Sequence, residues 1–341
     1  MSKISRRGRW IAAAAVAAGA VAVAGTTLGT GTGRALADAA QGSAQGQATQ
    51  SATAYRFATL DNAHDVTFNQ LLGINNEGTI AGYFGSGAAG HPNKGYLLFP
   101  RYGQGNYGGE NFPGSVQTQV TGLNDRGVTV GFWSSMNTAS MTNNNFGFWE
   151  RNGKFHNADF PTGTPASPPA DQLLGVNDSD IAVGFWTDAD GNSHGYTVDV
   201  DTGRFSSVTD PNSPSASLTA AAINNDGGIA GFYTNAGTGN TDGFLKVGGK
   251  FIDLAAPGAS STMALGVNDH DEVVGTYTVG SGSSAAMHGF TWTPKGGFAA
   301  LDDPHGMGTT TINGVNDAGD LVGFYVDSVG NTDGFLATPQ K

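Results

Sequence analysis

The chain has 341 residues, of which 54 are glycine and only 13% are charged, and it contains no cysteine. The absence of cysteine excludes disulfide bonds, a thiolate nucleophile and zinc–thiolate sites. A formal charge of −12 excludes nucleic acid and anionic lipid as expected partners, because both would be repelled.

The first 37 residues predict an export signal peptide. A basic start up to Arg9 is followed by a run rich in Ala, Val and Gly, and Ala35-Leu36-Ala37 fits a small-x-small cleavage pattern. Arg6-Arg7 resembles a twin-arginine export signal, although Gly8-Arg9-Trp10 stands where an apolar residue usually follows. The alternative is an uncleaved membrane anchor. Cleavage after Ala37 removes five basic and no acidic residues, so the formal charge of −12 becomes −17.

Residues 38–53 are small and polar and predict a flexible linker. The folded domain is therefore expected over residues 54–341. With the signal peptide removed, no further segment is expected to contact a membrane.

One phrase recurs in the rest of the chain and predicts a repeat fold. Its pattern is Gly, aliphatic, Asn, Asn or Asp, any residue, Gly or Asp, two residues, Val or Ala, Gly and an aromatic pair. The six copies lie at 72–84, 121–133, 174–186, 221–233, 265–277 and 313–325.

Each repeat predicts four β-strands. The first ends in an Asn-Asn or Asn-Asp step, which with a following Gly or Asp is hairpin-turn chemistry. The second is the alternating run into the aromatic pair. A Gly-Phe or Gly-Tyr phrase, such as 194–199, gives the third strand, and a phrase ended by Pro, such as 204–211, gives the fourth. Four short strands in about 48 residues match the size of a propeller blade.

The two ends of the chain predict that the repeats form a closed ring. The sixth unit stops at Lys341 after its third phrase, and the missing fourth phrase, RFATLD at 56–61, precedes the first copy. The alternative is an open β-solenoid, which would need caps and has no reason to split a unit. We therefore expect an all-β, six-bladed β-propeller closed by an N-terminal strand that completes the last blade.

The Gly-Ile/Val-Asn-Asn/Asp phrase followed by His-Gly-Phe resembles the HAF-type repeats of bacterial extracellular proteins. The resemblance covers about residues 54–338 and implies export and a repeat fold, without an agreed activity. His194 and His288 keep the family's His, whereas other residues replace it in four units: Lys94, Phe146, Asp242 and Asp333. A role for a ring of histidines is therefore weakened, and no catalytic residue is carried over.

Aromatic residues and one irregular segment supply the candidate binding residues. One aromatic ends the second strand of each unit; exposed, it would stack on sugar rings, and buried, it would pack between blades. Segment 100–112 differs from its counterparts and places charged and aromatic side chains on one long loop. The candidate binding set is Arg101, Tyr102, Tyr107, Glu110, Trp133, Trp186, His194 and His288.

Two further polar features are candidate sites. The first Asn of each phrase forms either a ring of amides at one end of a channel or six copies of one turn, and turn chemistry alone accounts for it. Asp188, Asp190 and Asn192 resemble the start of a calcium loop, because oxygen ligands at alternate positions can converge on a hard cation. A hairpin turn is the alternative, since no acidic residue follows at the far end of an EF-hand loop. Ca²⁺ is the one candidate cofactor.

The expected function is binding. The sequence contains no G-x-x-x-x-G-K phosphate loop and no H-x-x-x-H pair. We expect a secreted, monomeric propeller that binds an extracellular carbohydrate or protein. The alternative is an extracellular enzyme, a polysaccharide lyase or hydrolase, in which His, Arg, Tyr and acidic groups from different blades converge at the channel mouth.

Overall fold

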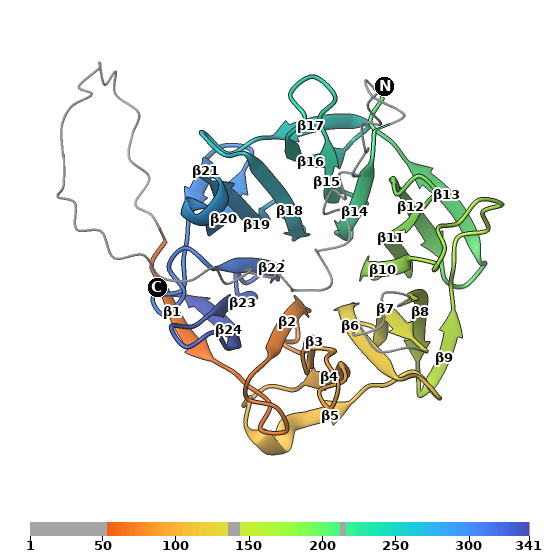
Figure 1. Ribbon diagram of the computed structural model, residues 1–341, viewed down its shortest axis with the longest axis horizontal. Helices are drawn as coiled ribbons and strands as arrows, with labels where there is room; N and C mark the ends of the chain where they lie inside the picture. Colours follow the sequence, from red (N-terminus) through yellow and green to blue (C-terminus); the bar gives the residue numbers. More distant parts are fainter. Residues whose placement is uncertain (1–52, 136–143, 212–215, 341) are drawn as a thin grey trace, which may run out of the picture. The chain divides into compact units, whose positions relative to one another are not determined.

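Four-stranded antiparallel sheets arranged around one axis make up the folded part of the chain (Figure 1). The computed structural model describes residues 53–135, 144–211 and 216–340, which from residue 54 onward belong to one compact unit, Ala54–Lys341. The predicted signal peptide, and the predicted linker up to residue 52, lie outside the described residues. The described residues form strands and two short 3₁₀ helices, so the all-β prediction is confirmed.

We number the sheets as blades 1 to 6 in chain order. Blade 1 holds β2 (Asn69–Ile74), β3 (Ile80–Phe84), β4 (Lys94–Leu98) and β5 (Tyr107–Gly109), with η1 (Gln104–Asn106) before β5. Blade 2 holds β6 (Gln117–Leu123), β7 (Val128–Ser134), β8 (Phe146–Arg151) and β9 (Lys154–Asn157). Blade 3 holds β10 (Asp171–Val176), β11 (Ile181–Thr187), β12 (Ser193–Asp199) and β13 (Arg204–Val208).

The second half of the ring repeats this order. Blade 4 holds β14 (Leu218–Ile223), β15 (Ile229–Thr234), β16 (Thr241–Val247) and β17 (Lys250–Leu254). Blade 5 holds β18 (Ser261–Val267), β19 (Val273–Val279), β20 (Ala286–Thr293) and β21 (Gly297–Ala300), with η2 (Gly282–Ser284) before β20. One parallel bridge, Thr241 to Ser261, joins blades 4 and 5.

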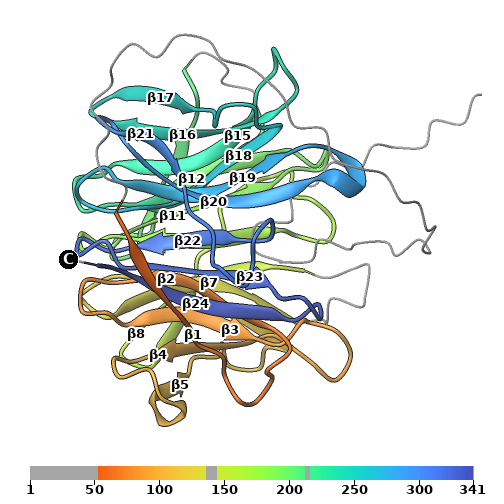
Figure 2. The same ribbon diagram turned by 90° about the vertical axis from the view of Figure 1, so that its left-hand side faces the viewer.

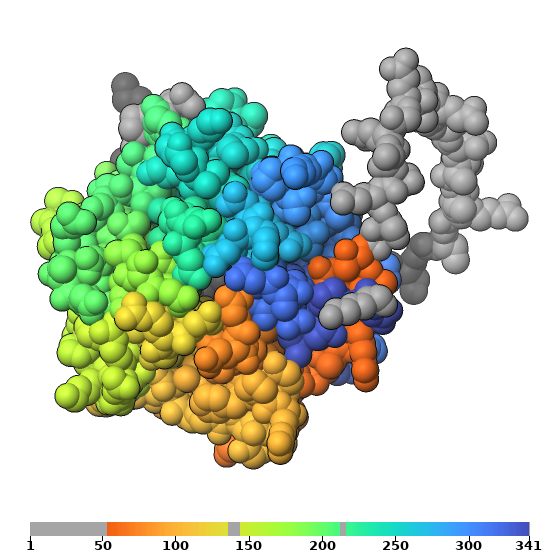
Figure 3. Space-filling model, turned by 180° about the vertical axis from the view of Figure 1, so that it is seen from behind, coloured from red at the N-terminus to blue at the C-terminus, as the bar shows by residue number. Residues whose placement is uncertain are grey.

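Blade 6 is assembled from both ends of the described chain. It holds β22 (Thr311–Val315), β23 (Leu321–Val326), β24 (Thr332–Pro339) and, as its outer strand, β1 (Tyr55–Thr59). β1 runs antiparallel to β24, with Tyr55 opposite Pro339 and Thr59 opposite Phe335. Figure 3 shows the orange start of the folded chain against the dark blue final strand. The segment predicted as the missing fourth strand therefore takes that place in the sheet.

The first Gly of the repeat lets the innermost strands approach each other. A Cβ atom on Gly73 would lie 3.0 Å from the carbonyl oxygen of Thr121 in the next blade, and one on Gly266 would lie 2.7 Å from that of Asn313. A register shift occurs just before this position in every inner strand. This position is Gly in five blades and Ala222 in blade 4, and so small a residue lets the backbones of neighbouring blades meet near the axis.

The alternating connections give the ring two faces (Figure 2). We call the turn face the one that carries the first and third hairpins of each blade; there Tyr102 Oη donates to Gly78 O at 2.9 Å and Arg151 pairs with Asp180 at 2.8 Å. The loop face carries the other connections. Asp180 and Asp271 replace Gly in two first hairpins with φ of 59° and 57°, the left-handed conformation expected of Asp there.

Candidate ligand-binding sites

The first Asn of each repeat builds a closed circuit of hydrogen bonds around the axis. In every blade its Nδ2 donates to the backbone carbonyl of the same Asn in the next blade, at 2.9 to 3.3 Å, and Asn316 returns the circuit to Asn75. Its Oδ1 meanwhile accepts the N–H four residues later, as Asn177 does from Ile181 at 3.1 Å. The turn interpretation is therefore correct, and the same amide also joins neighbouring blades.

The second residue of the Asn-Asn or Asn-Asp step builds another circuit. Its side-chain Oδ1 accepts the backbone N–H of the equivalent residue in the preceding blade, at 2.8 or 2.9 Å all the way round. In ring order these residues are Asn76, Asp125, Asp178, Asn225, Asp269 and Asp317. Each of the two Asn residues donates its Nδ2 to the Oδ2 atoms of both flanking aspartates, so all four Oδ2 atoms are bonded.

These circuits surround a central cavity of about 70 Å³. Six aliphatic side chains, the six first Asn residues and the six second residues line it. Among the described lining residues, the four aspartates are the ionisable groups. The cluster of His, Arg and Tyr required by the enzyme alternative does not line this mouth.

The predicted aromatic positions lie opposite the start of the third strand in each blade. Trp133 faces Phe146 and Trp186 faces His194 across the strand pair. Both Trp side chains are half-buried. Trp133 also stacks on Phe112, with ring centroids 4.6 Å apart. Because the loop from the preceding blade places this ring there, part of the Trp surface expected to meet sugars is covered.

Blade 3 brings a Trp, a His and an Asp together on the loop face. The rings of Trp186 and His194 stack with centroids 4.4 Å apart, and Phe160 lies 5.7 Å from Trp186. His194 Nε2 lies 2.8 Å from Asp188 Oδ2, and the two side chains are 39% and 18% exposed. We call Trp186, His194 and Asp188 the blade-3 site. It joins two of the candidate binding residues, Trp186 and His194, with one of the predicted calcium ligands, Asp188.

Blade 5 holds a matching arrangement. The rings of Tyr277 and His288 lie 5.4 Å apart, and His288 Nδ1 lies 2.7 Å from Asp302 Oδ2. His288 and Asp302 are 25% and 16% exposed. We call these three residues the blade-5 site. Tyr277 is one of the aromatics that end the second strands but was not in the candidate binding set, and Asp302 and the contact of Asp188 with His194 were not predicted. The register between the aromatic and the third-phrase His could have pointed to Tyr277.

The irregular segment 100–112 does not gather its four predicted residues in one pocket. Tyr102 and Tyr107 pack against the core of blade 1, and Arg101 is exposed. Glu110 lies instead between blades 1 and 2, where Thr129 Oγ1 donates to its Oε1 at 2.8 Å. Burial, together with the nearby carboxyl of Glu150, raises the pKa of Glu110 to about 7. This segment contributes to packing and to a buried carboxyl pair.

The predicted calcium ligands form a hairpin turn. Asp188 Oδ1 accepts the backbone N–H groups of Asp190 and Asn192, both at 2.9 Å. Burial alone would raise the pKa of Asp188, but hydrogen bonds from His194 and from this turn lower it to about 2. Within the described residues, no group of three or more His, Asp or Glu side chains is placed to hold a metal. Ca²⁺ binding stays a prediction.

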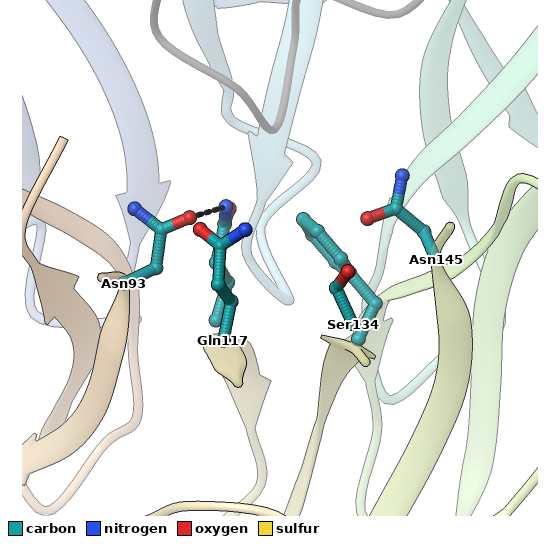
Figure 4. A pocket seen from close by; sticks show the side chains of 6 residues that line it. Asn93, Gln117, Ser134 and Asn145 are labelled. Carbon is teal, nitrogen blue, oxygen red and sulfur yellow. Dashed lines mark hydrogen bonds between the residues drawn. The ribbon is translucent and has the colours of Figure 1, made fainter. Parts of the chain in front are cut away.

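A second, smaller cavity lies between blade 2 and Asn93, the residue before β4 of blade 1 (Figure 4). Its volume is about 10 Å³, which is room for about one water molecule. Gln119 Nε2 donates to Asn93 Oδ1 at 2.9 Å beside it, and Gln117, Ser134 and Asn145 complete its polar lining. It is too small for an organic ligand.

Comparisons with known proteins yield likenesses among solved structures only. No family model and no curated protein sequence matches the chain. TolB from Acinetobacter baumannii has a TM-score of 0.46 and 12% identity over 77% of this chain, which spans 64% of TolB. A six-bladed fungal lectin from Aleuria aurantia that recognises fucose has a TM-score of 0.46 and 11% identity over 80% of this chain and 91% of the lectin.

A third likeness is to an ulvan lyase of polysaccharide lyase family PL25, with a TM-score of 0.43 and 13% identity over 79% of this chain and 78% of the lyase. The ligands and activities of these proteins are theirs. Within residues 53–135, 144–211 and 216–340, no helix has the length and hydropathy needed to cross a membrane.

Proposed function

We propose that this chain is an extracellular binding protein that recognises an uncharged carbohydrate at the blade-3 and blade-5 sites. The observation that supports it is the same combination in both: an aromatic ring beside an imidazole, with a carboxylate 2.7 or 2.8 Å from the imidazole. Two of the predicted binding residues, His194 and His288, occupy equivalent positions in these sites. The other four blades have Lys94, Phe146, Asp242 and Asp333 at this position.

The chemistry of both sites suits sugar hydroxyl groups. The imidazole and the carboxylate are the polar parts open to solvent, and each can exchange hydrogen bonds with a hydroxyl. The aromatic ring packs against the imidazole, and its edge can contact the C–H groups of a sugar ring. The carboxylate leaves the second imidazole nitrogen, Nδ1 of His194 and Nε2 of His288, facing a ligand.

The charge of the loop face favours a neutral glycan over an acidic one. The described parts of its loops contain ten acidic residues and no lysine or arginine. The acidic residues are Asp61, Asp65, Glu110, Asp159, Asp188, Asp190, Asp210, Asp302, Asp303 and Asp327. A uronic-acid or sulfated polysaccharide would be repelled by this surface.

A glycan array followed by calorimetry on the full-length chain tests this proposal. We expect neutral glycans to bind and uronic acid or sulfated glycans not to. His194→Ala together with His288→Ala should weaken binding at least about tenfold, a loss of about 1.4 kcal/mol. His156→Ala is the matched control, because His156 also stacks on a Trp, Trp149, at 4.0 Å, but belongs to β9.

Two results would contradict the proposal. One is binding that the double variant leaves unchanged; the other is a preference for acidic glycans. Hydrolysis or eliminative cleavage of a bound glycan by the wild-type chain would favour the enzyme alternative, a polysaccharide lyase or hydrolase.

Export, a monomeric state and a closed ring complete the proposal. We propose that residues 1–37 direct export, by the twin-arginine route, from a bacterial cell, and that the mature chain is a monomeric HAF-type repeat protein. The pairing of β1 with β24 and the return of both hydrogen-bond circuits from blade 6 to blade 1 support a six-bladed ring closed by the N-terminal strand. N-terminal sequencing of the exported protein and light scattering test the processing and the monomer.

A further inference from the structure

Exposed apolar side chains gather on the loop face of blade 6. The described residues include six large apolar side chains that are exposed; three of these lie on three neighbouring loops and a fourth, Val326, ends β23 beside them. They are Val66 at 58% exposure, Met307 at 77%, Val326 at 37% and Val329 at 79%. We call these four residues the blade-6 patch. Monomeric proteins seldom gather such residues without an interaction to make.

Hydrogen bonds hold the three loops against each other. Thr309 Oγ1 donates to Val326 O at 2.8 Å, which fixes the loop of Met307 to the end of β23. Thr332 N donates to Thr67 O at 3.1 Å, which fixes the loop of Val66 to the start of β24. The hairpin between these two strands carries Val329 near its tip.

The hairpin that presents Val329 is itself ordered. Asp327 Oδ1 accepts the backbone N–H groups of Val329 at 2.9 Å and of Asn331 at 2.8 Å. The patch therefore belongs to a preformed surface, and little conformational entropy would be lost when a partner covers it.

Acidic groups surround the blade-6 patch. Asp61, Asp65, Asp327 and Asp333 belong to the same three loops or their immediate flanks, which contain no lysine or arginine, whereas Asp303 in one of these loops is fully buried. Burial, with repulsion from Asp327 and Asp303, raises the pKa of Asp333. His64, His91 and His305 are the basic groups here, and His91 and His305 are each paired with an aspartate, at 2.7 and 3.1 Å. The surface is thus apolar at its centre and negative around it.

We propose that the blade-6 patch docks a segment of another protein that carries apolar side chains flanked by lysine or arginine. The apolar side chains would cover Met307 and Val329, and the basic ones would neutralise the surrounding carboxylates. A second copy of this chain in a symmetric arrangement is disfavoured, because it would bring two acidic surrounds together. An anionic bilayer would be repelled for the same reason.

Binding of peptides to the full-length chain tests this proposal. The probe is a pool of fluorescent 12-residue peptides in which Leu, Val or Phe alternates with Lys or Arg, and the matched pool has Asp or Glu in the basic positions. We expect fluorescence anisotropy to detect binding of the basic pool and not of the acidic pool. This binding should weaken as salt rises, because it depends on charge.

Two variants connect that binding to the patch. Met307→Ser with Val329→Ser should weaken binding of the basic pool at least about tenfold, or about 1.4 kcal/mol. Val116→Ser is the matched control, because Val116 is 39% exposed in the loop between blades 1 and 2 and lies outside the patch. Circular dichroism would show that all variants are folded.

Several outcomes would overturn the proposal. They are no binding of the basic pool, equal binding of both pools, and an equal loss of binding in the Val116→Ser control. Self-association of the wild-type chain that Met307→Ser with Val329→Ser abolishes would assign the patch to a second copy instead. A failure to bind glycans at the blade-3 and blade-5 sites would not change the expected peptide binding, because the blade-6 patch shares no residue with those two sites.

Discussion

Asn177 illustrates how one side chain serves both a turn and the ring. Its Oδ1 accepts the N–H groups of Ser179 and Ile181, both at 3.1 Å, and these bonds shape the hairpin. Its Nδ2 donates to Asn224 O in blade 4 at 3.0 Å. The side chain is 5% exposed, so any bond it loses leaves a buried group unpaired.

Two substitutions separate these roles. Asn177→Ala removes both, and we expect it to lower the free energy of unfolding by about 2 to 4 kcal/mol. Asn177→Asp keeps an acceptor for the turn but loses the donor to Asn224, and we expect about 1 to 3 kcal/mol. Denaturant unfolding measures both losses. An Asn177→Asp variant as stable as the wild type would mean that the inter-blade bond contributes nothing.

The sequence predicted the local role of these residues but not the one between blades. Hairpin chemistry depends on neighbours in the chain, and the Asn-Asp step with Gly or Asp specifies it. The bond from Asn177 to Asn224 depends on how closely two inner strands approach. Trp186, His194 and Asp188 likewise meet through strand register and loop conformation. In segment 100–112, Tyr102 and Tyr107 pack into blade 1 whereas Glu110 accepts a hydrogen bond from Thr129 of blade 2, an arrangement that depends on tertiary packing.

At the level of elements, β1 can be compared with the outer strands of the other blades, because it comes from the opposite end of the chain from the rest of blade 6. Phe57 lies 5.6 Å from Phe335 of β24, between ring centroids. Phe205, at the equivalent position in β13, lies 5.5 Å from Tyr196 in the same way. The sequence predicted this equivalence from the phrase at 56–61, since an outer strand needs only the alternation and the aromatic that its neighbours have.

The matched pair Phe57→Ala and Phe205→Ala measures this equivalence. Both rings are half-buried, and we expect each substitution to lower the free energy of unfolding by about 1 to 3 kcal/mol. Thermal unfolding followed by circular dichroism gives the two losses. A Phe57→Ala variant within about 0.5 kcal/mol of the wild type, with Phe205→Ala clearly destabilised, would mean that β1 is dispensable.

For the whole molecule, the buried carboxyl groups between blades determine how stability varies with pH. Burial raises the pKa of Asp171 to about 7, despite hydrogen bonds from Tyr196 and from Phe160 N, and the nearby Asp159 adds to the rise. The pKa of Asp61 is likewise raised to about 6 by burial. A raised pKa means that the folded protein binds the proton more tightly than the unfolded chain. The stability it provides is therefore lost as pH rises through the folded value.

We expect the free energy of unfolding to be highest near pH 4 and to fall toward pH 8. Below about pH 4 it should fall again, because the pKa of Asp188 is lowered to about 2 and its stabilising ionised form is lost. Asp171→Asn should remove about 2 to 3 kcal/mol of the decrease between pH 5 and 8. Asn suits the position, since Asn69 holds it in blade 1 and accepts Asn62 N at 2.9 Å. Urea unfolding across this range checks the prediction, and a variant with the wild-type pH profile would contradict it.

The hydrogen-bond circuit built by the second residue of each Asn-Asn or Asn-Asp step also restricts how the gene for this chain can change. Two Asn residues supply the four N–H groups that the four aspartate Oδ2 atoms require, and this balance holds because the order Asn, Asp, Asp occurs twice around the axis. An Asn-bearing blade exchanged with a neighbouring Asp-bearing blade, or a single blade duplicated, would place two Asn residues or three aspartates in succession and break the match. Recombination that moves three blades together would preserve it. The repeats resemble six interchangeable modules, but the axis makes the half-ring of three the unit that can be copied.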